Sequence, residues 1–389
     1  MILRHLLDAG ETGLRVLAHS TGSSPSCHAR FSISRRFAPI LLVIAVFAGP
    51  SVAADRQVPW LSEVSAVPAT IPPTTLAPLW NGPLTKESWS ARRTELRKLW
   101  RDTLGRMPER PASTTFRVLR TDDLPDVTRL LIEYECEPSL NVQAYLLRPK
   151  SAKPDHSTAG IVALHPTTAE TIEPIAGVVG EPRQHLGLAL AQRGFVVICP
   201  RCFLWQDVKN YQEAVDRFRE RHPQTLGMHK MLYDAQRALD ILAALPEVDA
   251  ERIGAVGHSL GAKEALYLAA FDDRVKAAVA SEGGLGLTST NWDAPWYLGP
   301  KVRQPEFARN HHELVAMIAP RPFLVIGGES GNGAADGDRS WPYLQAARPI
   351  YELHTSSPAV GMLNHRGGHP LPLELFPRVA EWFEVYLAK

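Results

Sequence analysis

The feature that most constrains the fold of this chain is the segment 252–262, in which a short apolar run leads directly into Gly-His-Ser-Leu-Gly and then into an alanine-rich stretch. The apolar run is typical of a buried strand, and the alanine-rich stretch is typical of a helix. A strand that passes into a helix through so tight a turn has no room for side chains beside its apex, which explains Gly257 and Gly261. The segment therefore predicts a sharp strand–turn–helix unit with Ser259 at its apex.

Short apolar runs alternate with helical stretches through the C-terminal part of the chain. We predict strands at residues 160–164, 195–199, 253–256, 275–280, 323–326 and 360–363. We predict helices between and after them at residues 184–192, 231–245, 262–270, 341–351 and 375–387. Short, fully apolar strands separated by helices are typical of a parallel sheet whose two faces are both covered.

The preceding part of the chain has a different rhythm. Residues 87–104 show helical periodicity, with most of their large apolar side chains near one face. Three β-rich runs follow at 115–119, 127–134 and 142–147, separated by turn residues, which predicts an antiparallel meander. An antiparallel start that feeds a mostly parallel sheet, with helices on both faces, is the α/β-hydrolase arrangement, and this is the predicted fold class.

The N-terminus resembles an export signal. Arg35 and Arg36 precede an apolar run at 38–49, and the small residues at 51–54 suit signal peptidase. The run is shorter than the roughly 20 residues that a membrane span needs. We therefore divide the chain into a signal peptide with a long leader (1–54), an N-terminal arm and helix (55–110) and a catalytic domain (111–389). This predicts a secreted or periplasmic protein that does not stay in the membrane after the signal is removed.

Charge and cysteine content narrow the possible partners. The formal net charge is +1, with 42 Lys and Arg against 41 Asp and Glu, and no basic run is apparent, so we expect no nucleic-acid partner. The mature chain would keep Cys136, Cys199 and Cys202, an odd number. Cys199 and Cys202 have redox or metal spacing but stand without a second cysteine pair, so we predict no metal and expect a structural disulfide or buried thiols.

Ser259 is the candidate nucleophile. The glycine-flanked turn exposes its hydroxyl at the end of a strand, and the helix N-terminus behind it favours developing negative charge. A serine hydroxyl needs a base to remove its proton. His369 lies in a glycine-supported loop after the last predicted strand and just ahead of the last helix, so we predict that it is the base. His365, closer to the strand end, is the alternative, and its expected role is structural.

The remaining parts of such a site are an oxyanion hole and an acid. Two backbone N–H groups are needed for the oxyanion, and we assign Leu260, which follows the nucleophile, and Thr167, because Pro166 has no N–H. For the acid we favour Asp336, in the loop after strand 323–326, with Asp338 and Glu282 as alternatives. Glu282 follows strand 275–280 and lies 23 residues after Ser259.

Several pieces of the sequence resemble one known family. These are the segments 163–166, 253–259, 319–322 and 367–369. They look like the dienelactone-hydrolase and acetyl-xylan-esterase branch of the α/β-hydrolase superfamily, over roughly Trp80 to the C-terminus. Glucuronoyl esterases are a related resemblance, because some place their acid after the strand where Glu282 lies. Dienelactone hydrolases proper use a cysteine nucleophile, so Ser259 points toward ester hydrolysis and away from dienelactone.

Together these features predict a serine carboxylic-ester hydrolase that works through an acyl-enzyme and needs no cofactor. Export suggests acylated carbohydrate as substrate, as for an acetyl xylan esterase, and Trp292 and Trp296 are candidate substrate-binding residues, with packing as their alternative role. The alternatives are a glucuronoyl esterase, a serine peptidase of the prolyl-oligopeptidase type, or a relative that binds without catalysis. The last is disfavoured because both Ser259 and His369 are present. The sequence leaves the oligomeric state open.

Overall fold

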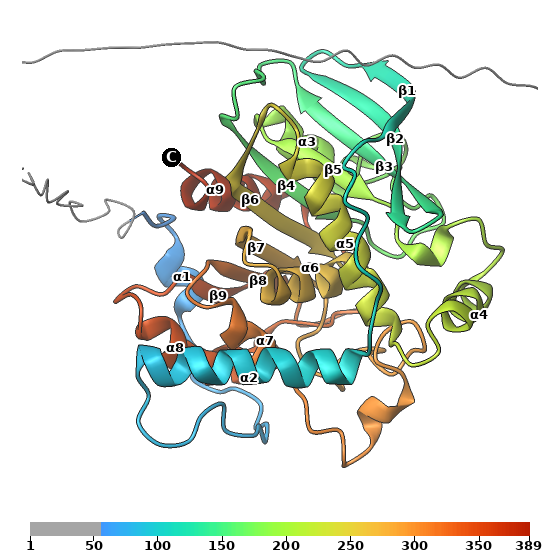
Figure 1. The fold of residues 1–389 in the computed structure, drawn as a ribbon. Coiled ribbons are helices and arrows are strands. Elements are labelled where there is room, and N and C mark those ends of the chain that lie inside the picture. Colours follow the sequence, from blue (N-terminus) through green and yellow to red (C-terminus); the bar gives the residue numbers. More distant parts are fainter. Residues whose placement is uncertain (1–55) are drawn as a thin grey trace, which may run out of the picture. The chain divides into compact units, whose positions relative to one another are not determined.

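A computed structural model describes residues 56–389 of the chain, and this part forms one compact unit. Its centre is a single nine-stranded sheet with the order β1-β2-β3-β5-β4-β6-β7-β8-β9 (Figure 1). The predicted leader at 1–54 lies outside the described residues, so export stays a prediction. The predicted division at residue 110 is also untested.

The first part of the sheet is antiparallel. β1 (Arg117–Asp123), β2 (Val127–Glu137) and β3 (Leu140–Pro149) form a meander, and β3 joins the rest of the sheet by antiparallel pairing with β5 (Val196–Pro200). β1 is mostly exposed because it is an edge strand with charged residues on both faces, whereas most residues of β2 and β3 are buried.

The second part of the sheet is parallel. Its remaining strands are β4 (Thr158–Leu164), β6 (Val248–His258), β7 (Val275–Ser281), β8 (Phe323–Gly327) and β9 (Val360–Asn364). All neighbouring pairs from β5 to β9 are parallel. The carboxyl ends of these strands therefore meet at one edge of the sheet, where α/β proteins bind their ligands.

Helices cover both faces of the sheet. The bounds of the helices are α1 (Leu61–Ser65), α2 (Lys86–Leu104), α3 (Leu186–Gln192), α4 (Tyr211–Arg221), α5 (Gly227–Ala243), α6 (Leu260–Phe271), α7 (His311–Ile318), α8 (Trp341–Glu352) and α9 (Phe376–Tyr386). One buried apolar cluster contains residues of α2, α5, α6, α7 and α8, and a second, on the other face, contains residues of α1, α3 and α9 (Figure 1).

Local sequence explains how α2 begins. The backbone N–H of Ser88 donates to the hydroxyl of Thr85 at 3.1 Å, and the N–H of Thr85 donates to the hydroxyl of Ser88 at 2.9 Å. This reciprocal capping box satisfies two N–H groups that would otherwise lack partners at the start of the helix. The buried faces of Trp89, Leu96 and Trp100 then attach α2 to the core.

The predicted fold class is confirmed: the sheet is mostly parallel, with antiparallel N-terminal strands and helices on both faces. Three helices were not predicted, α1, α4 and α7. Within residues 56–389 no helix is long and apolar enough to cross a membrane.

The three cysteines of the described chain are buried thiols. Cys199 belongs to the apolar cluster with α3 and α9, whereas Cys202 belongs to the cluster on the opposite face. Burial raises the pKa of the Cys136 thiol to about 12 and raises that of Cys199 as well. The spacing of Cys199 and Cys202 therefore does not bring the two sulfurs together, and both remain protonated packing residues.

Candidate active site

Ser259 occupies the sharp turn between β6 and α6. Its backbone φ of 57° and ψ of −114° lie in a region that non-glycine residues rarely adopt, which costs of order 1–3 kcal/mol. A Cβ at Gly257 would collide with the carbonyl of Gly261, and a Cβ at Gly261 would collide with the carbonyl of Leu164. The two glycines thus allow the turn, and the Ser259 N–H is held by the carbonyl oxygen of Ser281 at 2.7 Å.

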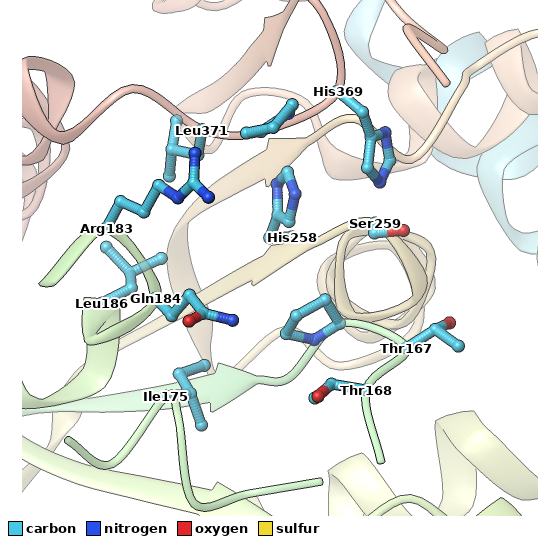
Figure 2. Close-up of a pocket in the computed structure, with 12 residues that line it drawn as sticks. Thr167, Thr168, Ile175, Arg183, Gln184, Leu186, His258, Ser259, His369 and Leu371 are labelled. Carbon is cyan, nitrogen blue, oxygen red and sulfur yellow. The ribbon is translucent and has the colours of Figure 1, made fainter. Parts of the chain in front are cut away.

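His369 faces the same space as Ser259. It lies in the loop after β9, and its ring and that of His258 have centroids 4.9 Å apart (Figure 2). The Nδ1 atom of His369 is buried and has no hydrogen-bond partner among the described residues. A Cβ at Gly333 would lie 3.7 Å from this nitrogen, so the loop after β8 packs closely against it.

The two predicted oxyanion donors belong to different elements. Leu260 is the first residue of α6, and Thr167 follows β4 and lines the space in front of Ser259 (Figure 2). His165 shapes this loop: its Nδ1 donates to the Pro166 carbonyl at 2.8 Å and its Nε2 accepts from the Cys202 N–H at 3.1 Å. Burial lowers the pKa of His165 to about 4, consistent with a neutral ring.

Glu282 follows β7 and points into the catalytic region from a left-handed backbone conformation, with φ of 58°. Its Oε1 accepts from the Gly328 N–H and lies 3.6 Å from Nε2 of His365, while its Oε2 accepts from the N–H of Ala335 at 2.7 Å and of Asp336 at 3.2 Å. Burial alone would raise its pKa. The His365 contact and the three backbone donors outweigh burial, so the pKa of Glu282 is lowered and the group is ionised at neutral pH.

The other two carboxylates have different partners. Asp336 accepts from the N–H groups of Gly284 at 2.9 Å and Leu285 at 3.0 Å and from the Ser340 hydroxyl at 2.6 Å. Burial raises its pKa.

Asp338 accepts from Nδ2 of Asn364 at 2.9 Å and from Nη1 of Arg366 at 2.7 Å. Both aspartates thus tie loops together, and these contacts do not support the sequence-based preference for Asp336 as the acid.

Two pockets meet at Ser259 and His369. We call the first the Arg183 pocket: it measures about 220 Å³, and Figure 2 shows the Arg183 guanidinium and the Gln184 amide directed into it. Its walls are largely apolar, built from Pro166, Ile175, Leu186, Pro370 and Leu371.

The second, which we call the Lys263 pocket, measures about 300 Å³. Its lining is mainly polar, with Lys263, Glu282, Ser289, Thr290, Asn291 and Tyr297 among its residues. Thr167 borders both pockets as well. An ester held at Ser259 can therefore extend in two chemically different directions.

Lys263 is a functional candidate that sequence reasoning missed. Its side chain is almost fully buried, and its Nζ donates to the carbonyl of Gly283 and to Oγ1 of Thr290 at 2.7 Å. Burial lowers its pKa to about 7, although the Asp336 carboxylate acts in the opposite direction. The available signal was its position four residues after Ser259, in the first turn of the helix that follows the nucleophile.

Trp292, one of the two tryptophans predicted to bind substrate, has a packing role. Trp292 is only 1% exposed, its Nε1 donates to the Gly284 carbonyl at 2.8 Å, and its ring lies 4.4 Å from Nζ of Lys263. It therefore packs beneath the Lys263 pocket and does not offer a face to substrate. Trp296 is half-buried against Tyr211 and Tyr297, so its predicted contact with substrate stays a prediction.

The site contains two further histidines with structural contacts. His258 places Nδ1 3.1 Å from the Ser281 hydroxyl, and burial, together with His369, lowers its pKa to about 3. Nδ1 of His365 accepts from the Gly367 N–H at 3.2 Å, which turns its Nε2 toward Glu282. Across residues 56–389, no group of three or more His, Cys, Asp or Glu side chains is arranged to hold a metal ion.

Comparisons of sequence find similar proteins among the hydrolases. The model of the dienelactone hydrolase family matches residues 142–307. The protein YtaP of Bacillus subtilis (strain 168), whose name assigns it only to the hydrolases, is 33% identical over 104 residues. The match covers 25% of this chain and 34% of YtaP, so the chain spans about a third of the length of this curated relative.

Solved structures with the same fold include several esterases. A glucuronoyl esterase from Solibacter usitatus superposes with a TM-score of 0.64 at 17% identity, over 82% of this chain and 99% of the other. A glucuronoyl esterase from Teredinibacter turnerae gives 0.62 at 20% identity, over 79% and 88%.

An acetyl xylan esterase from a Paenibacillus species gives a TM-score of 0.50 at 16% identity, over 84% of this chain and 98% of the other. At these identities the likeness shows the fold. The chain therefore has the α/β-hydrolase fold, and its central part matches the dienelactone hydrolase family.

Proposed function

We propose that this chain is a serine esterase that cleaves carboxylic esters of carbohydrates through an acyl-enzyme. The observation that carries the proposal is the backbone of Ser259, held at a positive φ on the turn between β6 and α6 and facing His369 across a shared pocket. A chain has no structural need for such a strained serine, whereas a nucleophile must be presented in this way.

The proposed reaction uses four groups of the site. The Ser259 hydroxyl attacks the ester carbonyl and loses its proton to Nε2 of His369, while the N–H groups of Thr167 and Leu260 bind the oxyanion. His369 then gives the proton to the leaving alcohol. Water enters, His369 removes one of its protons, and the acyl group leaves as a carboxylic acid while Ser259 regains its hydrogen.

For the acid we propose Glu282 in place of Asp336. Glu282 borders the Lys263 pocket together with Ser259 and His369, and its lowered pKa keeps it anionic. Its Oε2 accepts from the N–H of Ala335. Ala335 lies in the same loop as Gly333, which packs against Nδ1 of His369. A carboxylate that accepts from this nitrogen would fix the ring and stabilise the imidazolium, and Glu282 is the carboxylate that borders the same pocket as His369.

The lining of the Lys263 pocket supports a hydroxylated substrate. Ser289, Thr290 and Asn291 supply hydroxyl and amide groups, and the Lys263 ammonium supplies a buried donor. Buried polar groups of this kind bind ligands whose own hydroxyls replace the lost water. The structural neighbours named as glucuronoyl and acetyl xylan esterases act on such molecules, which is consistent with acylated sugar as the substrate class.

Two other functions fit less well. A peptidase of the prolyl-oligopeptidase type usually carries an N-terminal propeller, and the described residues before the sheet form an arm and the helices α1 and α2. A protein that only binds has no use for the strained Ser259. Export through the N-terminal segment is part of the proposal, because polymeric sugar esters lie outside the cell.

A labelling experiment tests the proposal. A fluorophosphonate probe should modify Ser259 covalently, as located by peptide mass spectrometry, and the Ser259→Ala chain should remain unlabelled. Acetylated xylo-oligosaccharides, methyl glucuronate and a proline-containing peptide should then be compared as substrates. Absence of labelling, or faster cleavage of the peptide than of both sugar esters, would contradict the proposed function.

A further inference from the structure

A long groove lies on the surface beside α2 and α5, separate from both catalytic pockets. It measures about 990 Å³. Its walls are the end of α2, the chain that leaves α2 and runs beside α5, and the turn between α4 and α5 (Figure 1). We call it the arginine groove, because its lining includes Arg101, Arg106, Arg110 and Arg221.

The charge of the groove is unbalanced. Arg110 forms a salt bridge with Asp240 at 2.7 Å. The carboxylate of Asp102, which also lines the groove, forms a salt bridge with Lys98 at 2.6 Å. Among residues 56–389, Arg101 and Arg106 form no salt bridge, and Arg221 approaches Glu137 only at 3.7 Å. On a chain whose net charge is +1, this is a local excess of cationic donors.

The groove also has a fixed shape. The Leu226 N–H donates to the Leu104 carbonyl at 2.9 Å, and the Thr225 hydroxyl donates to the Arg106 carbonyl at 2.5 Å. Tyr233 on α5 donates to the Glu109 carbonyl at 3.2 Å. Burial lowers the pKa of His229, on the same wall, to about 4, so its ring is neutral and adds no charge to the groove.

α5, which forms one wall of the groove, also contacts a loop near the catalytic region. The first turn of α5 packs on the loop 292–299: Gly227 touches the backbone of Trp296, and the Met228 N–H donates to the Tyr297 carbonyl at 3.1 Å. Tyr297 in turn borders the Lys263 pocket. α5 therefore connects one wall of the groove with a loop that borders the Lys263 pocket.

We propose that the arginine groove binds a carboxylated polysaccharide, a chain of sugars that includes uronic acids. A guanidinium matches a carboxylate through two parallel hydrogen bonds, which favours Arg for this task. The few unpaired arginines suit a polymer with at most one charge per sugar, whereas duplex DNA carries one charge per ~1.7 Å of its axis and demands a denser array. The choice of a sugar polymer rests on the proposed function, but the binding itself needs no catalysis.

The test uses the full chain carrying Ser259→Ala, so that no substrate is consumed. Its affinity for glucuronoxylan and for neutral arabinoxylan is measured by affinity electrophoresis at low salt and again with added NaCl. Arg101→Gln with Arg106→Gln should weaken glucuronoxylan binding about tenfold, the effect of about 1.4 kcal/mol. Added salt should reduce the difference, because exposed charges are screened.

The matched control removes two exposed arginines elsewhere, Arg117→Gln with Arg193→Gln, and should bind as the parent does. In chains that retain Ser259, both double variants should hydrolyse 4-nitrophenyl acetate like the parent, which shows that they fold. Equal loss in groove and control variants, equal affinity for arabinoxylan, no binding at all, or tighter binding of a DNA duplex would each overturn the proposal. Failure of ester hydrolysis with intact binding would instead reject only the proposed function.

Discussion

The Arg183 and Lys263 pockets share the nucleophile and the base but differ in almost everything else. The Arg183 pocket has largely apolar walls, whereas the Lys263 pocket is lined mainly by polar groups and includes the buried amine of Lys263. Apolar walls tolerate varied groups, since one methylene changes binding by only ~1–3 kcal/mol. Buried polar groups reject any ligand that leaves them unpaired. The comparison therefore predicts that the Lys263 pocket sets specificity and that the Arg183 pocket is permissive.

The largest effect should come from the residue that both pockets share. Ser259→Ala should abolish hydrolysis of every ester, on the order of a million-fold in kcat, because the acyl-enzyme cannot form. Burst and steady-state kinetics with 4-nitrophenyl acetate measure the loss, and circular dichroism checks the fold. If the variant kept more than about a hundredth of the activity, another residue would be the nucleophile.

The second effect concerns the carboxylate beside the Lys263 pocket. Glu282→Gln should lower kcat by on the order of 10⁴, because an amide can no longer stabilise the imidazolium or hold the correct tautomer. Asp336→Asn and Asp338→Asn are the matched controls and should each stay within about tenfold of the parent. If Asp336→Asn were inactive and Glu282→Gln were active, the catalytic acid would be Asp336, in the loop after β8.

The parallel part of the sheet could be predicted from the sequence because its strands are short, continuous apolar runs that alternate with helical stretches. The position of Ser259 at a sharp turn could also be predicted from the sequence, because Gly257 and Gly261 indicate a turn that is formed locally. α4 was missed because its pattern is dominated by charged residues, and its helical state depends on a cap by Asn210, whose side chain accepts from the Glu213 N–H at 3.0 Å.

The acid could not be assigned from sequence, because the choice depends on tertiary contacts. Asp336 and Glu282 both lie at strand-end loops, and only the folded chain shows that Asp336 holds the turn at Gly284. The arginine groove was hidden for the same reason. Arg101 and Arg221 are far apart in sequence, so the sequence contains no basic run that would indicate the groove.

The third effect tests the selectivity of the Lys263 pocket directly. Lys263→Met should reduce kcat/KM for an acetylated xylo-oligosaccharide by about 10- to 100-fold, the value of one charge-assisted hydrogen bond. Hydrolysis of 4-nitrophenyl acetate, which has no hydroxyls, should change much less. An equal loss on both substrates would mean that Lys263 supports the fold of the site and does not recognise sugar.

The same lysine predicts a pH dependence of stability. Its pKa is lowered from 10.5 to about 7 in the folded chain, so between these values the unfolded chain holds the extra proton. The free energy of unfolding should therefore gain a term that rises with pH in this window, by at most about 1.4 kcal/mol per pH unit. Denaturant titrations from pH 7 to 10 should show that Lys263→Met removes this rise. A parallel pH profile in parent and variant would contradict the lowered pKa of Lys263.

The smallest effect should come from the Arg183 pocket, which we expect to be the permissive one. The Arg183 side chain is 51% exposed, and its Nε lies 2.8 Å from Oε2 of Glu181, so its contact with a ligand is exposed to solvent. Exposed charged contacts contribute ~0.2–1 kcal/mol, which corresponds to at most about a fivefold change. Arg183→Ala should therefore raise KM by up to about fivefold for esters with a bulky group that fills this pocket, and leave kcat and the sugar acetates unchanged.

Arg193→Ala provides the control for this last measurement. Arg193 is 50% exposed and also pairs with a glutamate, Glu384, at 2.7 Å, but it lies outside both catalytic pockets. Its replacement removes the same charge and should leave KM unchanged for every ester. If Arg183→Ala lowered kcat, or changed the sugar acetates more than the bulky esters, Arg183 would take part in the reaction centre. The assignment of specificity to the Lys263 pocket alone would then be wrong.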